Sequence, residues 1–145
     1  MGKDVAPNVT EKVTFASPAW VDIARTVLEE LVAAHGETGK SFSVCEVFTD
    51  APPGMAGADA TTAAWHFRIV DKTVSVGEGE IVDADMNVRV DYESLLPLAR
   101  LVYTPEMLAD MERNPPQFQG AATGDRSNMP PYLAALHNRL AVATR

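Results

Sequence analysis

The chain has 145 residues, of which 46% are hydrophobic and 22% charged, a balance typical of a globular protein with a proper core. Its formal net charge of -8 argues against binding to nucleic acid or to anionic membranes by charge, because both need clustered Lys and Arg. One cysteine excludes an internal disulfide, and no apolar run reaches membrane-span length, so we expect a single cytoplasmic domain over 1–145 without integral membrane association.

The N-terminal part shows no sustained period, and we expect an extended lead-in over 1–16 with Phe15 docked onto the body. Ser17 and Pro18 predict a helix start, because Ser caps the first turn and the missing N–H of Pro costs nothing there. Gly36 predicts the end of this helix. Its inward face consists of apolar residues spaced three and four apart: Trp20, Ile23, Ala24, Val27, Leu28, Leu31 and Val32.

A strand is predicted next, over residues 42–48. Alternation puts its apolar residues on two faces: Phe42, Val44 and Phe48 on one, Cys45 and Val47 on the other. Residues 51–60 predict a loop, because two prolines and two glycines cannot sustain a strand.

Three further runs alternate apolar and polar residues, over 65–70, 73–77 and 85–91. Each therefore predicts a strand with one covered face. Asp71 and Lys72 form a short polar break that predicts a hairpin between the first two. We expect an antiparallel meander whose covered face carries Trp65, Phe67, Ile69, Val74, Val76, Met86, Val88 and Val90.

Two helices are predicted after these strands. Asp91 caps a helix that reaches about Leu101 and is kinked by Pro97, and the pair Thr104-Pro105 opens a shorter one. A short strand over 118–124 and a last helix after Pro131 complete the chain. The inward residues expected on the last helix are Tyr132, Leu133, Leu136, Leu140 and Val142.

Residues with catalytic or metal-binding chemistry are scattered. The three histidines, His35, His66 and His137, form no paired motif, so we expect no metal site and no cofactor. Cys45 lies mid-strand, where a thiol is a small core residue with a raised pKa. An acid–base site from Glu46, Asp50 and His66 remains open as an enzyme alternative, and it requires a buried carboxyl group.

The cover over the sheet face is the remaining signal. It consists of short helices interrupted by proline, and methionines gather late in the chain, at Met86, Met107, Met111 and Met129. Methionine fills irregular space, and such a cover packs imperfectly. A cavity between sheet and helices is therefore plausible.

The order of these signals resembles the sterol carrier protein-like, or non-specific lipid-transfer, domain. The resemblance covers roughly residues 17–140. It is carried by the Ser17-Pro18-x-Trp20 helix start, Trp65-x-Phe67-x-Ile69, Val74-x-Val76, Ala84-Asp85-x-x-Val88-x-Val90-Asp91 with Leu95, and Phe118-x-Gly120-x-x-x-Gly124.

The resemblance implies an α+β fold in which helices cover one face of a mostly antiparallel five-stranded sheet and enclose an apolar tunnel for a lipid, sterol or acyl chain. It implies binding or transfer without catalytic residues; the alternatives are an enzyme or accessory subunit using the same cavity, and a homodimer packed through the sheet face. The mouth candidates are His66 and Arg89. The expected lining is Trp65, Phe67, Ile69, Val76, Met86, Val88, Val90, Leu95, Met107, Met111 and Phe118.

Overall fold

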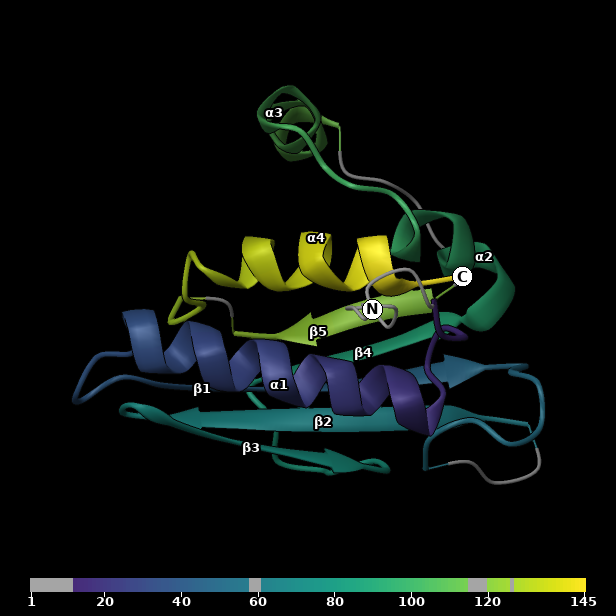
Figure 1. Ribbon diagram of the computed structural model, residues 1–145, viewed down its shortest axis with the longest axis horizontal. Helices are drawn as coiled ribbons and strands as arrows, with labels where there is room; N and C mark the ends of the chain where they lie inside the picture. The colour runs from purple at the N-terminus through teal and green to yellow at the C-terminus, as the bar shows by residue number, and fades with distance from the viewer. Residues whose placement is uncertain (1–11, 58–60, 115–119, 126) are drawn as a thin grey trace, which may run out of the picture.

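The computed structural model describes residues 12–57, 61–114, 120–125 and 127–145. In this part of the chain, helices cover one face of a five-stranded mixed sheet (Figure 1), which confirms the predicted α+β class. The helices are α1 (Pro18–His35), α2 (Tyr92–Ala99), α3 (Pro105–Arg113) and α4 (Leu133–Ala143). The strands are β1 (Ser41–Thr49), β2 (Ala63–Val70), β3 (Thr73–Glu78), β4 (Met86–Asp91) and β5 (Gly120–Gly124).

Helix α1 begins and ends where its sequence predicts. The Ser17 side chain accepts a hydrogen bond from the Trp20 backbone N–H, and the helix stops before Gly36. The reason for a glycine at this position is steric. Its φ of -61° is open to any residue, but a Cβ there would lie 2.5 Å from the Val32 carbonyl oxygen. Gly36 is therefore needed for space and not for a left-handed conformation.

The sheet order is β3-β2-β1-β4-β5. The predicted hairpin between β2 and β3 is confirmed, and its turn residue Asp71 takes a positive φ of 55°. The predicted meander is wrong at its third strand. Strand β4 does not pair with β3. It pairs in parallel with β1, so β2 and β1 lie between β3 and β4 in the sheet.

A crossover over residues 79–85 explains this arrangement. It passes across the sheet face opposite the helices, where Ile81 and Ala84 pack against Cys45, and the Ile81 N–H donates to Cys45 Sγ. At its end, one Asp85 carboxylate oxygen accepts hydrogen bonds from both the N–H and the hydroxyl of Ser43. These contacts place the start of β4 beside β1.

Helices α1 and α4 lie over the other face of the sheet, side by side in Figure 1. An aromatic cluster forms the core at one end, where Phe15 contacts Trp20, Phe48 and Tyr92 with ring centroids 4.8–5.2 Å apart. The predicted docking of Phe15 is thus confirmed. On α4, Leu136 and Leu140 are buried as expected, along with Ala141, which was not predicted. Val142 was predicted inward but is 59% exposed.

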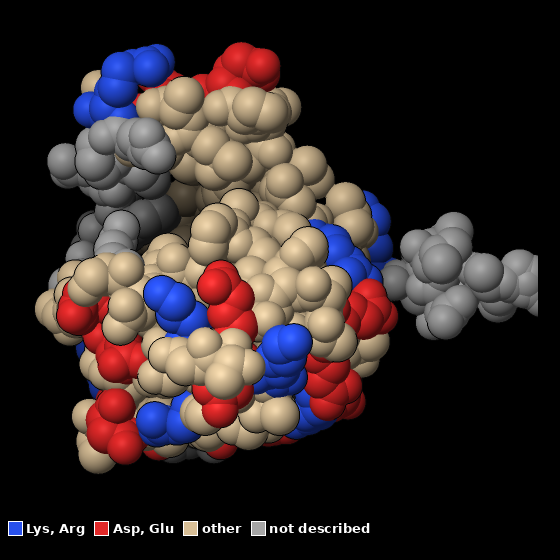
Figure 2. Space-filling view, turned by 90° about the vertical axis from the view of Figure 1, so that its left-hand side faces the viewer, with Lys and Arg blue, Asp and Glu red and all other residues tan. Residues whose placement is uncertain are grey.

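Helix α2 begins at Asp91, whose carboxylate accepts from the Ser94 N–H, and it contains Pro97, both as predicted. Helix α3 is capped by Thr104 and projects from the body, with none of its described side chains buried (Figure 1). Figure 2 shows charged side chains on the outer side of this projection and uncharged surface toward the hollow beneath it. No helix in the described part of the chain is both long and apolar enough to cross a bilayer.

Candidate functional site: a cavity between sheet and helices

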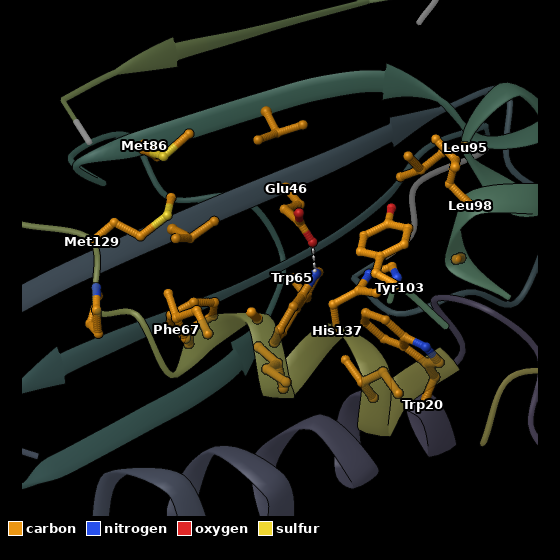
Figure 3. Close-up of a pocket in the computed structure, with 18 of the residues that line it drawn as sticks. Trp20, Glu46, Trp65, Phe67, Met86, Leu95, Leu98, Tyr103, Met129 and His137 are labelled. Atoms are coloured by element: carbon orange, nitrogen blue, oxygen red, sulfur yellow. Dashed lines mark hydrogen bonds between the residues drawn. The ribbon is translucent and has the colours of Figure 1, made fainter. Parts of the chain in front are cut away.

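A cavity of about 500 Å³ lies between the sheet and helices α2 and α4 (Figure 3). This volume falls in the range of about 300–1,000 Å³ that is typical of small-molecule sites. Nearly all of its lining side chains are apolar. They are Phe15, Trp20, Val44, Trp65, Phe67, Met86, Val88, Leu95, Leu98, Ala99, Met129, Pro130, Pro131, Leu133, Ala134, Leu136 and Leu140, with Glu46, Tyr103 and His137 as the polar members.

The sheet floor of the cavity follows from strand alternation. Side chains two residues apart point to the same face, so Val44 and Glu46 of β1 face the helices together. The register places Glu46 opposite Trp65 on β2 and beside Val88 on β4. A carboxyl group therefore stands between two apolar neighbours in the middle of the floor.

Glu46 is held by one short hydrogen bond. Its Oε1 accepts from Trp65 Nε1–H at 2.6 Å, whereas its Oε2 has no hydrogen-bond partner among the described residues. Burial raises the pKa of the Glu46 carboxyl, because the charged form loses its hydration, and the Trp65 hydrogen bond opposes this shift only in part. Protein surrounds the group, and the surface that it still exposes borders the cavity.

A second polar group forms the wall toward α4. The rings of Tyr103 and His137 stack with centroids 3.8 Å apart, and His137 Nε2 lies 2.8 Å from the Leu101 carbonyl oxygen. The Asn138 side chain makes two hydrogen bonds to the Tyr103 backbone: its Oδ1 accepts from the Tyr103 N–H, and its Nδ2 donates to the Tyr103 carbonyl oxygen. Burial lowers the pKa of His137, so the neutral ring with an Nε2–H donor is favoured there. Burial likewise raises the pKa of the Tyr103 hydroxyl.

Five of the predicted lining residues are brought together in this cavity: Trp65, Phe67, Met86, Val88 and Leu95. Their positions follow from the strand period and from the Asp91 cap, which orients the first turn of α2 over the sheet.

Other predicted lining residues lie elsewhere. Ile69 and Val90 are buried in the core, and Val76 lies half-buried on β3, the strand that packs against α1. Met107 and Met111 are on α3, which projects from the body, and no described side chain of α3 belongs to the lining. Phe118 falls outside the described residues.

Neither His66 nor Arg89, the predicted mouth residues, lines this cavity. His66 alternates with Trp65 and Phe67, so it points to the sheet face opposite the helices, where its Nδ1 lies 2.8 Å from the Gly79 carbonyl oxygen. Arg89 is exposed, and its guanidinium lies 3.5 Å from a Glu80 carboxylate oxygen.

The three side chains of the acid–base alternative do not point toward one another. Glu46 faces the cavity and His66 the opposite side of the sheet, while Asp50 is exposed just after the end of β1. These three side chains do not form one site, although the buried carboxyl group that the alternative required is present in Glu46.

Several lining residues were not predicted, and some had a usable signal. Glu46 shares the two-residue period of Val44 and Phe48, so its place on the covered face was readable. Trp20 was assigned to the inward face of α1 but not to a cavity. Tyr103 and His137 are far apart in the chain, and no local pattern indicates the contact between their rings.

Comparison with known proteins gives structural likeness alone. No protein-family model matches the sequence, and neither does any curated protein. The crystal structure of sterol carrier protein 2 matches with a TM-score of 0.51 and 17% identity, over 89% of this chain and 96% of that chain.

Two further structures match less well. One is a conserved hypothetical protein from Thermus thermophilus described as a possible sterol carrier protein (TM-score 0.48, 16% identity, 92% of each chain). The other is UbiJ-SCP2, a ubiquinone synthesis protein (TM-score 0.39, 16% identity, 87% of this chain and 94% of that chain). At 16–17% identity a likeness shows the fold alone, and only the match to sterol carrier protein 2, among these three, has a TM-score above 0.5. The chain has the sterol carrier protein fold that its sequence resembles.

Proposed function

We propose that this protein binds a small hydrophobic ligand in the cavity between sheet and helices, and holds or transfers it without covalent chemistry. The observation that carries the proposal is a partly open cavity of about 500 Å³ whose described lining is apolar except for three residues. A concave, mostly apolar space of this size with a few polar groups is typical of small-molecule sites. The fold likeness to sterol carrier protein 2 supports the same proposal.

The energetics allow useful affinity. Burial of about a dozen methylene groups contributes roughly 10 kcal/mol, at about 0.8 kcal/mol each. Association costs at least about 4 kcal/mol, which leaves a dissociation constant of tens of micromolar at the tightest from burial alone. Contacts with a polar end of the ligand would strengthen binding beyond that value.

The two tryptophans of the chain make a direct assay possible. Trp20 and Trp65 both line the cavity, so intrinsic fluorescence reports its occupation. We expect 1-dodecanol to change the emission in a saturable way, and native mass spectrometry to show one bound ligand per chain.

Matched variants locate the site. Ala99→Phe on α2 fills the cavity and should weaken dodecanol binding at least about tenfold, because the ligand must displace the ring. Ala109→Phe places the same ring on exposed α3 and should leave binding unchanged. Equal binding by both variants would contradict the proposal, as would a protein that takes up no apolar probe and purifies as a ligand-free dimer.

A further inference from the structure

Glu46 is out of keeping with the rest of the cavity floor. It is the one carboxyl group among the lining residues, and no Lys or Arg in the described part of the chain lines the cavity beside it. The other polar residues of the lining are Tyr103 and His137, whose rings stack, and the lowered pKa of His137 makes that ring a poor counter-charge. Figure 3 shows Glu46 pointing toward Trp65, with its hydrogen bond drawn.

A purely structural role explains only one of the two oxygens of the Glu46 carboxyl group. Trp65 Nε1–H needs one acceptor, and Glu46 Oε1 supplies it at 2.6 Å. The second oxygen, Oε2, has no partner among the described residues, and it borders an apolar space. A buried acceptor without a hydrogen bond is costly, and such groups in folded proteins are rare unless water or a ligand completes them.

We propose that Glu46 Oε2 accepts a hydrogen bond from the polar end of the ligand, so that the cavity selects apolar molecules ending in a hydroxyl or amine over those ending in a carboxylate. This inference rests on the proposed function and names the ligand class of the same cavity. Trp65 orients the carboxyl group through Oε1 and leaves Oε2 for the donor.

Hydrogen-bonding capacity and charge explain how Glu46 would distinguish the polar ends of different ligands. An alcohol or ammonium group donates to Oε2 of the ionised carboxylate and completes the unpaired acceptor. Because burial raises the pKa of Glu46, the test below uses pH 8, which favours the ionised form over its state at lower pH. A ligand carboxylate has no proton to donate and brings a second negative charge into a space of low dielectric. An ester avoids the charge but still leaves Oε2 without a donor. The protein's own net charge of -8 adds to the preference for neutral or cationic ligands.

The test compares three chain-matched probes, 1-dodecanol, methyl dodecanoate and dodecanoate, each below its aggregation limit at pH 8 and followed by tryptophan fluorescence. Wild-type protein should bind dodecanol at least about tenfold more tightly than either of the others, because a site built for a hydrogen-bond donor rejects analogues that lack it. Glu46→Gln keeps the size and the acceptor for Trp65 but adds an amide donor. It should lower the dodecanol-to-dodecanoate affinity ratio by about tenfold or more, mainly by improving dodecanoate binding.

The outcomes separate this inference from the proposed function. If all three probes bind and the ratio is the same in wild type and Glu46→Gln, the selection by Glu46 is overturned while ligand binding stands. If wild type prefers dodecanoate, the inference is overturned as well. If no probe binds either protein, the proposed function fails, and the inference with it. Circular dichroism of Glu46→Gln checks that the comparison is made on folded protein.

Discussion

Replacing Trp65 by Phe removes the indole N–H that donates to Glu46 and leaves an aromatic ring on the cavity floor. At pH 8, which favours the ionised Glu46 carboxylate, a hydrogen bond to a charged group contributes about 1.5–3 kcal/mol net. The smaller ring also loses packing against Trp20 and Phe67, whose centroids lie 5.1 and 5.4 Å from that of Trp65. We expect Trp65→Phe to lower the free energy of unfolding by about 3 kcal/mol in total.

A double-mutant cycle separates the two contributions. Glu46→Leu removes the acceptor and the desolvated carboxyl group together, so Trp65→Phe in that background should cost only the packing share, about 1 kcal/mol. The coupling free energy should therefore be about 2 kcal/mol. Urea denaturation of the four proteins, followed by circular dichroism because one tryptophan is lost, measures it. Effects that add within about 0.5 kcal/mol would refute the idea that this hydrogen bond organises the floor.

Four further predictions follow from the same structure. Because burial raises the pKa of Glu46, the folded state holds its proton more tightly than the unfolded state; the stability that this group contributes is present below about pH 4 and is lost as the pH rises through its folded pKa. The free energy of unfolding of Glu46→Gln, measured in urea titrations, should therefore increase relative to that of wild type as the pH rises from 4 to 8. Tyr103 and His137 are the other titratable groups that border the cavity, and both are present in the two proteins. A difference between the two proteins that does not change with pH would contradict a raised pKa of Glu46. Ser17→Ala should cost about 1 kcal/mol because α1 belongs to the core, whereas Thr104→Ala, at the equivalent cap of projecting α3, should change global unfolding by less than about 0.5 kcal/mol. Gly36→Ala should cost about 1–3 kcal/mol, and Gly36→Asn more, because room and not φ is limiting; a better-tolerated Asn would point to a left-handed residue after all. Cys45 is 1% exposed and burial raises its thiol pKa, so iodoacetamide should label it much more slowly in native protein than in urea, and equal rates would show the strand to be open.

Local features of this fold were legible in the sequence. The bounds of α1 follow from Ser17, Pro18 and Gly36, and the cap of α2 from Asp91, since each signal acts within a few residues of the element that it begins or ends. The hairpin of β2 and β3 was equally local. Two-residue alternation also put Trp65 and Met86 on the covered face, and both line the cavity.

Strand neighbours were decided by tertiary structure. Alternation says which side chains share a face but not which strands lie side by side, so the sequence alone favoured a meander. The crossover over 79–85 instead carries the chain behind the sheet and sets β4 parallel to β1, through contacts with Ser43 and Cys45 on a strand far earlier in the chain.

The cavity itself shows the same division. The sequence by itself determined that the sheet face was apolar and that its cover was short and broken by proline. Which residues enclose the space depended on how α2, α4 and the strands pack, and this excluded Met107 and Met111 while bringing in Tyr103 and His137. The position of Glu46 was readable from its period, but its half-paired carboxyl group was not. That arrangement exists only because antiparallel pairing sets Trp65 opposite it, and the helices then cover both side chains.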